Sequence, residues 1–315
     1  MGQLEVSKAE HYDINAQTRQ LGDNWVAMSN ALTRAGHGLT LGEKRLVFCA
    51  ISKIDSKRML RPGEAPTSRV TVADYVDVAK CEPSAAYEAL QTAAKNLYNR
   101  TISFYVQAKN RKGRTADESI THMRWVGRAT YKKTEGWVEL AWWHEVLPHL
   151  IGLQKGFTQY QLRQTHALRS VYSWKLLELL IKFESTGWAQ YTIDDFSTAM
   201  EATPKQRENF ANIRRKIIEP AIKELTEKNG WNIQFRQIKA GRKVQALRFD
   251  FVLPADFVPA GAPEPSDKVD QGGIPEPSPS PSSSPYEDRS NTCPACGIGQ
   301  RLEGFSVCKT CAEEL

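Results

Sequence analysis

Residues 192–252 read TIDDFSTAMEATPKQRENFANIRRKIIEPAIKELTEKNGWNIQFRQIKAGRKVQALRFDFV, and this stretch decides the fold. Thr192 is placed to cap a short helix, and Pro204 begins a longer helix that we expect to run through Lys228. Two runs of alternating apolar and polar residues then flank a tight turn at Gly241, which predicts a β-hairpin. A short helix, a break, a long helix and a hairpin follow one another in a winged helix.

The preceding part of the chain repeats this order. Thr71 or Asp74 is placed to cap a short helix. The pair Glu82–Pro83 breaks it, and a longer helix follows from Pro83 to Arg100, as in a helix-turn-helix. Three runs rich in β-branched and aromatic residues come next and predict the strands of a wing: TISFYVQA, ITHMRWVGRATYKK and GWVELAWW.

Periodicity and composition complete the predicted organisation. Helical spacing of apolar residues predicts two early helices, at Asn24–Ala35 and Leu39–Ile54. Nine prolines between Pro254 and Pro285, with almost no aliphatic residues, predict a disordered linker. We predict an α+β fold of two tandem winged-helix domains, with one large α+β domain as the alternative. The predicted parts are a flexible segment 1–22, domain 1 over 23–155, domain 2 over 156–253, the linker 254–290 and a small zinc-ribbon-like module 291–315.

Charge is distributed unevenly along the chain. The formal net charge is +6, but residues 251–315 hold 4 Lys and Arg against 10 Asp and Glu, which leaves about +12 on residues 1–250. A basic globular region attracts polyanions through counterion release, so nucleic acid is the leading partner class, and ordinary solvated Lys and Arg are the alternative. No apolar run approaches the roughly 18 residues of a spanning helix. We therefore expect a cytoplasmic protein without a membrane partner.

Four cysteines near the end of the chain form two close pairs. Cys293 and Cys296 are separated from Cys308 and Cys311 by eleven residues. This spacing is typical of two thiolate knuckles around a tetrahedral Zn²⁺, and four sulfur ligands leave no open position for catalysis. We predict a structural zinc ion here, with disulfides as the alternative.

Motifs for catalysis are missing from the sequence. It contains no Gly-Lys dipeptide, which excludes a Walker A phosphate loop and a nucleotide cofactor bound in that way. Its six histidines never form a His-x-His pair, so the metal site typical of rolling-circle nicking enzymes is absent from the pattern. We therefore predict that the protein is not an enzyme.

The helix predicted at Lys205–Lys223 has two chemically distinct faces. Its apolar residues fall on one side at 100° per residue, and its hydrogen-bonding residues fall on the other. Because Asn pairs with adenine and Arg with guanine in the major groove, we predict base contacts from Asn209, Asn212 and Arg215. An ordinary amphipathic surface helix is the alternative.

Cations on the same helix and at the hairpin tip are predicted to bind phosphate. Gly241 permits a tight turn between basic residues, so the hairpin tip resembles a wing lying along a DNA backbone. A merely solvated turn is the alternative. The predicted phosphate contacts are Lys205, Arg207, Arg214, Lys216, Lys239, Arg242 and Lys243.

From Asn24 to Phe251 the chain resembles the Rep family of initiators from iteron-containing plasmids. Six segments carry the resemblance in order: NALTRAGHGLTLGEKRLVFCAISKID, AYEALQTAAKNLYNRTISF, LPHLIGLQKGFTQYQL, LRSVYSWKLLELLIKF, NFANIRRKIIEPAIKEL and GRKVQALRFDF. The resemblance implies two winged-helix domains that bind repeated double-stranded DNA sites at a plasmid origin, with the second domain as the main sequence reader.

The resemblance also implies partners. The first domain would form a homodimer and contact the DNA backbone, monomers would open the origin and recruit the host helicase and initiator proteins, and dimers would repress transcription. A winged-helix transcriptional repressor without an initiator role is the alternative function, and a nicking replication enzyme is a third hypothesis. The cysteine module lies outside the resemblance.

Overall fold

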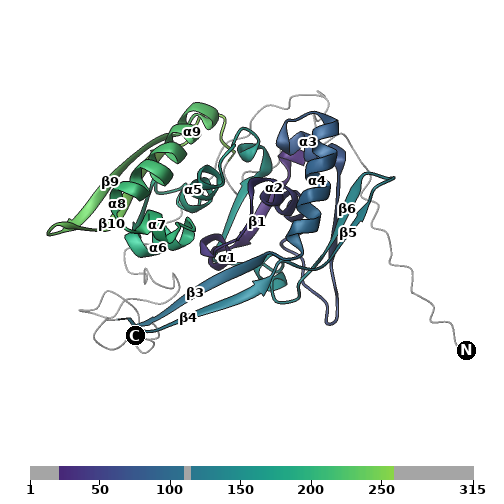
Figure 1. Ribbon diagram of the computed structural model, residues 1–315, viewed down its shortest axis with the longest axis horizontal. Coiled ribbons are helices and arrows are strands. Elements are labelled where there is room, and N and C mark those ends of the chain that lie inside the picture. Colours follow the sequence, from purple (N-terminus) through teal and green to yellow (C-terminus); the bar gives the residue numbers. More distant parts are fainter. Residues whose placement is uncertain (1–20, 110–114, 259–315) are drawn as a thin grey trace, which may run out of the picture. The chain divides into compact units, whose positions relative to one another are not determined.

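The computed structural model describes residues 21–109 and 115–258, which form a mixed α+β fold (Figure 1). Its first elements are the 3₁₀ turn η1 (Leu21–Asp23), β1 (Trp25–Ser29), α1 (Asn30–Arg34), α2 (Leu41–Ile51), β2 (Thr67–Thr71), α3 (Val72–Ala79), α4 (Pro83–Leu97), β3 (Thr101–Lys109), β4 (Thr115–Arg124), β5 (Val126–Lys132), β6 (Trp137–Trp142) and the 3₁₀ turn η2 (Leu147–His149). There follow β7 (Phe157–Gln161), the 3₁₀ turn η3 (Leu162–Thr165), α5 (Val171–Ile181), β8 (Trp188–Thr192), α6 (Ile193–Ala199), α7 (Pro204–Arg207), α8 (Phe210–Ile213), the π-helical turn η4 (Arg214–Ile218), α9 (Glu219–Asn229), β9 (Asn232–Ala240) and β10 (Lys243–Val252).

Helices α2, α3 and α4 pack with the antiparallel sheet β2–β6–β5 to form the first winged helix. Thr71 begins α3 by accepting a hydrogen bond from the Asp74 amide, and the Asp74 side chain accepts one from the Thr71 amide, so the two predicted capping residues act together. Pro83 occupies the first turn of α4, where its missing N–H leaves no unpaired acceptor. The predicted helix-turn-helix is present.

The strands of the first half divide differently from the prediction. The expected strand ITHMRWVGRATYKK is broken at Trp125, whose side chain is fully buried and whose Nε1 donates to the His37 carbonyl at 2.9 Å. Consequently β4 pairs with β3 in a separate two-stranded ribbon, and β5 pairs with β6 in the wing (Figure 1). Burying the indole at the break explains why one apolar run contributes to two sheets.

The second winged helix consists of α6 to α9 and the antiparallel sheet β8–β10–β9, and its helix α9 packs on α5. Its inner sheet face packs on α6, where the rings of Phe196 and Phe249 stack with centroids 5.5 Å apart. The β9–β10 hairpin projects beyond the helices in Figure 1, as the alternation around Gly241 predicted.

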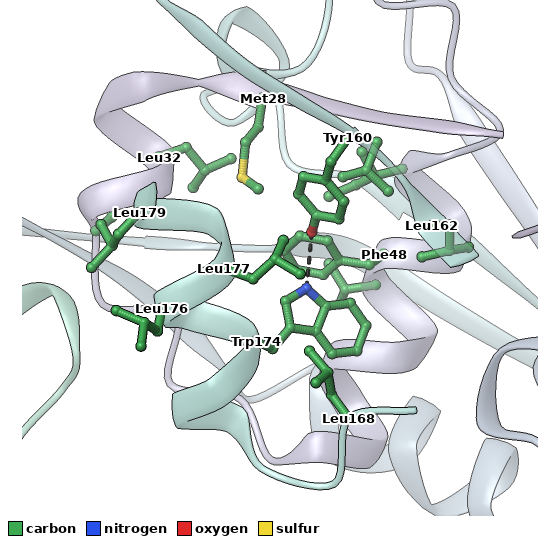
Figure 2. Packing of buried hydrophobic residues seen from close by; sticks show 14 of the residues in the cluster. Met28, Leu32, Phe48, Tyr160, Leu162, Leu168, Trp174, Leu176, Leu177 and Leu179 are labelled. Carbon is green, nitrogen blue, oxygen red and sulfur yellow. Dashed lines mark hydrogen bonds between the residues drawn. The ribbon is translucent and has the colours of Figure 1, made fainter. Parts of the chain in front are cut away.

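Helix α5 lies at the centre of the hydrophobic core. Trp174 on α5 is fully buried, its ring meets that of Phe48 edge to face at 5.3 Å, and its Nε1 donates to the Tyr160 hydroxyl at 2.9 Å (Figure 2). Helix α5 also packs against α9, β7 and α1. This all-round burial fits the nearly continuous apolar sequence VYSWKLLELLI, in which no polar face is available for solvent.

The helix predicted at Asn24–Ala35 is wrong in its first part. Residues Trp25–Ser29 form the strand β1, which pairs antiparallel with β7, and only Asn30–Arg34 are helical. The partner strand lies about 130 residues further along the chain. Local periodicity could not reveal such a long-range pairing, because a short apolar run fits a buried helix or a buried strand.

The predicted boundary between domains 1 and 2, after residue 155, lies just before β7, which pairs with β1 of the first half. Helix α5 contacts α1 before this boundary and α9 after it, so the boundary stays a prediction. The linker from residue 259 onward, the module 291–315 and most of the segment 1–22 lie outside the described residues. Within the described ranges, no helix is long and apolar enough to cross a membrane.

Candidate nucleic-acid interface

The helix-turn-helix of the second winged helix begins with two capped helices. The Thr192 hydroxyl accepts from the Asp195 amide at 3.1 Å at the start of α6, as predicted. Thr203 and Gln206 form a capping box at the start of α7, and Pro204 occupies its first turn. The N-terminus of each helix is thereby fixed, at Thr192 for α6 and at Thr203 for α7.

Arg207 binds the end of α6. Its guanidinium donates to the carbonyls of Ala202 at 2.8 Å and Ser197 at 3.1 Å, and to the Thr198 hydroxyl at 3.3 Å. Such a planar donor fork suits several acceptors at once, in this case two carbonyls and a hydroxyl at the end of α6 and just after it. The structure thus engages Arg207, predicted as a phosphate contact, in holding the turn.

The long helix predicted from Pro204 to Lys228 is interrupted, which corrects the sequence prediction. Asn209 has an extended backbone, with φ −151° and ψ 155°, and caps a new helix, α8. The π-helical turn η4 then follows immediately before Pro220. Since Pro220 has no N–H, a regular α-helical bond cannot form there, and a wider turn accommodates the missing donor.

The two asparagines predicted to contact bases hold this break together. The Asn209 side-chain oxygen accepts from the Asn212 amide at 3.0 Å, and the Asn212 side-chain nitrogen donates to the Lys205 carbonyl at 3.0 Å. An amide side chain has two donor hydrogens and two acceptor lone pairs, so each asparagine keeps capacity for a base edge. Asn209 is exposed and Asn212 is half-buried.

Three consecutive cations follow Ile213, which faces the core. Arg214 is exposed and its Nε lies 2.6 Å from the Glu219 carboxylate. Arg215 is exposed, and its Nε makes a long contact of 3.4 Å to the Ala211 carbonyl. Lys205 and Lys216 are exposed and form no ion pair within residues 21–109 and 115–258. Arg215, Lys205 and Lys216 therefore retain charge for a polyanion.

The hairpin tip carries the remaining predicted phosphate contacts. Gly241 has φ +60°, a left-handed conformation that glycine adopts without strain, and Lys239, Arg242 and Lys243 around it are exposed. In the described part of the chain none of these three cations pairs with a carboxylate. The tip is therefore a concentrated, unneutralised positive charge.

A cleft of about 390 Å³ joins the helix to the hairpin, a feature that the sequence analysis missed. It is lined by Arg214, Phe235, Arg236, Gln237 and Lys239. Arg214 and Lys239, predicted separately, thus line the same cleft. Alternation along β9 could have found Gln237, because residues two apart in a strand share a face and Gln237 lies between Phe235 and Lys239.

The corresponding helix of the first winged helix, α4, is constructed differently. It is uninterrupted, and the Tyr87 hydroxyl donates to the Lys133 carbonyl in the β5–β6 turn at 2.6 Å. Lys95 is its one cation within Pro83–Leu97. The four cysteines of the predicted zinc module lie outside the described residues. In the described ranges, no cluster of three or more His, Cys, Asp or Glu is arranged to hold a metal.

Comparison with known proteins matches each half of the described chain to a family model. Residues 25–181 match the family model described as Initiator Replication protein, WH1, and residues 192–251 match the model described as Initiator Rep protein, WH2. The PI protein of Escherichia coli is 25% identical over 275 residues, covering 78% of this chain and 86% of that protein. A replication initiation protein of Escherichia coli is 23% identical over 233 residues, covering 72% of this chain and 69% of that protein.

A solved structure supports the same fold. The crystal structure of Pi initiator protein in complex with iteron DNA superimposes with a TM-score of 0.60 at 23% identity, covering 75% of this chain and 99% of that one. The match extends over both winged helices, which confirms the prediction of a tandem arrangement. With both family models matched in order, this chain belongs to the family of initiator replication proteins built from a WH1 and a WH2 domain.

Proposed function

We propose that this protein initiates plasmid replication by binding tandem repeats in double-stranded DNA, with WH2 as the main sequence reader. The initiator family to which it belongs supports this function, as does its similarity to a Pi initiator crystallised with iteron DNA. The observation that carries the proposal is the group of exposed cations without carboxylate partners, in the described part of the chain, on the WH2 helix-turn-helix and hairpin: Lys205, Arg215, Lys216, Lys239, Arg242 and Lys243.

The proposed contacts follow from these positions. The exposed side of α8 and η4 enters the major groove, where Asn209, Asn212 and Arg215 meet base edges. Lys205 and Lys216 flank these residues and bind phosphates. The β9–β10 tip follows the backbone through Lys239, Arg242 and Lys243, and the cleft at Arg214 accepts a phosphate between helix and hairpin.

Other steps of initiation belong to the same proposal. WH1 forms the homodimer and adds backbone contacts, and the monomer opens the origin and recruits the host helicase and initiator proteins in the cytoplasm. The dimer represses transcription of the gene that encodes it. No nucleotide cofactor and no catalytic residue enters this scheme, in keeping with a family of DNA-binding initiators.

Footprinting on DNA that flanks the coding region tests the function. We expect protection of directly repeated sites, and purified protein should bind a duplex carrying them far more tightly than a scrambled duplex of the same length. Equal affinity for both duplexes would contradict sequence-specific binding. Normal plasmid replication after deletion of the coding region would favour the repressor, and nicking of supercoiled DNA with Mg²⁺ would favour the enzyme.

We further propose that Cys293, Cys296, Cys308 and Cys311 hold a structural zinc ion. The spacing of the two pairs supports it, because four thiolates satisfy tetrahedral Zn²⁺. Metal analysis of the purified chain should find one zinc per chain, and Cys308→Ser should abolish it. A metal-free wild-type protein purified under reducing conditions would contradict the site.

A further inference from the structure

Glu201, at the end of α6 in WH2, binds a loop of WH1. Its Oε1 accepts from the His37 amide at 2.9 Å, and its Oε2 accepts from the Gly38 amide at 2.9 Å. Both carboxylate oxygens are thus used by consecutive backbone N–H groups. Such charge-assisted bonds are among the stronger hydrogen bonds in proteins.

The loop that receives Glu201 is shaped as an anion cradle. Gly38 has φ +61°, and successive amides directed at one point around such a residue form a backbone nest for an anion. A Cβ added to Gly38 would lie 2.9 Å from the Thr101 carbonyl, so a side chain there has no room. A Cβ added to Gly36 would lie 3.6 Å from Cγ of Glu201, which shows how closely the carboxylate arm approaches.

The cradle is fixed to the core of WH1. His37 is 2% exposed, and its carbonyl accepts from the buried Trp125 indole at 2.9 Å. Lys175 donates to the neighbouring Ala35 carbonyl at 2.8 Å. A cavity of about 230 Å³ lies beside the loop, and the cations Lys44, Arg100 and Lys175 line it together with Glu201. Lys44 and Arg100 are already paired with Glu178 and Glu43, so the direct partners of the Glu201 carboxylate are the two backbone amides of the loop.

On the WH2 side, Glu201 is part of the helix-turn-helix itself. Its backbone has φ +52°, a left-handed conformation that is unfavourable for a residue with a side chain, and it directly precedes Ala202, whose carbonyl binds Arg207. A strained residue is retained where surrounding contacts determine its position. Here the left-handed residue closes the C-terminus of α6, where the Ala202 amide donates to the Ser197 carbonyl at 2.9 Å, and its side chain reaches the WH1 cradle.

We propose that Glu201 is a positioning residue that fastens the WH2 helix-turn-helix to WH1, so that both winged helices meet a DNA repeat as one preformed unit. The inference rests on the proposed function, because it assumes that both domains contact the same site. Preorganisation lowers the entropy lost on binding, so a protein without this contact would bind a repeat more weakly while keeping its general attraction to DNA.

Two variants of the full-length chain test this inference. Glu201→Gln keeps the size of the side chain but replaces one acceptor oxygen with a donor, which faces an amide N–H. Glu201→Gly removes the carboxylate and also relieves the left-handed strain, so it separates the contact from backbone strain. Glu227→Gln is the control, because Glu227 is exposed on α9 and, among the residues that the structure describes, has only a 3.8 Å ion pair with Lys223.

The first measurement needs no DNA. Amide hydrogen exchange of His37 and Gly38 should accelerate roughly tenfold or more in both Glu201 variants and remain unchanged in Glu227→Gln. The circular dichroism spectrum should be retained in all three. Wild-type exchange at these two amides as fast as in Glu201→Gly would overturn the contact.

The second measurement compares repeat and random duplexes. Both Glu201 variants should bind the repeat roughly five- to twentyfold more weakly and bind a scrambled duplex within about twofold of wild type. Unchanged repeat affinity in both variants would overturn the positioning role. A wild-type chain that binds repeat and scrambled duplexes equally would overturn the proposed function and, with it, the role of Glu201 in DNA binding. The hydrogen-exchange experiment tests the contact between Glu201 and the WH1 loop independently of DNA.

Discussion

Two charged regions of this molecule use their charges in opposite ways. Around α5, Lys44 and Glu178 are 3.0 Å apart and almost wholly buried, and the Tyr160 hydroxyl donates to the same carboxylate at 3.0 Å. On α8, η4 and the β9–β10 hairpin, cations such as Arg215 and Lys216 are exposed and, in the described part of the chain, have no carboxylate partner. The charges of the first region stabilise the fold, and the charges of the second region remain available to bind a polyanion.

Breaking the buried pair should have the largest effect. Lys44→Met leaves the Glu178 carboxylate buried without its cation, so the free energy of unfolding should fall by about 3–5 kcal/mol. Denaturant titration measures this directly. Lys216→Met is the matched control on the exposed surface, and its stability should stay within about 0.5 kcal/mol of wild type. A loss below about 1 kcal/mol for Lys44→Met would show that the pair contributes little.

The buried Lys175 should make stability depend on pH. Burial is the main cause that lowers the pKa of Lys175 from 10.5 to about 7; Lys44 lowers it further, and Glu178 and Glu201 raise it. Between these two values the unfolded chain binds more protons at this site than the folded chain, so folding gains stability as the pH rises from about 7 to about 10.5.

Comparison with Lys175→Met isolates this site. The unfolding free energy of wild type minus that of the variant should increase by about 3 kcal/mol between about pH 6.5 and pH 9.5, and stay level below that window. Urea titrations of both proteins at several pH values provide the difference. A difference independent of pH would mean that the Lys175 ammonium is not penalised by burial.

Arg207 is an exposed WH2 cation that already binds acceptors within the protein, so it tests whether a cation on this surface serves folding or DNA binding. Arg207→Lys keeps the charge but loses the planar fork that binds three acceptors, so the unfolding free energy should fall by about 1–3 kcal/mol. Thermal and denaturant unfolding measure the change. Retained stability with weakened DNA binding would instead favour the phosphate contact predicted from the sequence.

The smallest effect belongs to the hairpin tip. Arg242→Ala removes one exposed cation, so affinity should fall evenly across DNA sequences and the slope of log affinity against log salt should decrease by about one. Stability should be unaffected. Titrations at several salt concentrations on repeat and scrambled duplexes measure this, and a loss confined to the repeat would assign Arg242 to base recognition.

Elements defined by local chemistry could be predicted from the sequence. Thr71 and Thr192 cap the helices expected of them, Gly241 makes the hairpin turn, and the order of elements gave both winged helices. Long-range pairing could not be predicted, and strand β1 was assigned to a helix for that reason. The break at Asn209 was also missed, since an asparagine fits the polar face of a helix and the cap of a new one equally well.

Part of the candidate site could not be predicted from the sequence either. Helical periodicity placed Arg207 near the DNA surface, but its partners at the end of α6 depend on how the turn folds. The Glu201 contact joins residues more than 160 positions apart, and no local pattern indicates it. The sequence thus identifies the basic side chains, and the tertiary structure decides which of them already bind acceptors within the protein.

The proposed function requires that the exposed WH2 surface distinguishes repeat from random DNA. Fluorescence anisotropy titrations of Arg215→Ala, and of Lys95→Ala on α4 of WH1 as the matched cation, test it on the footprinted repeat and on a scrambled duplex. We predict that Arg215→Ala loses about 1–3 kcal/mol on the repeat and much less on the scrambled duplex, with a smaller and sequence-independent loss for Lys95→Ala. Equal losses for the two variants on the repeat, or an Arg215→Ala loss that is the same on both duplexes, would contradict the claim.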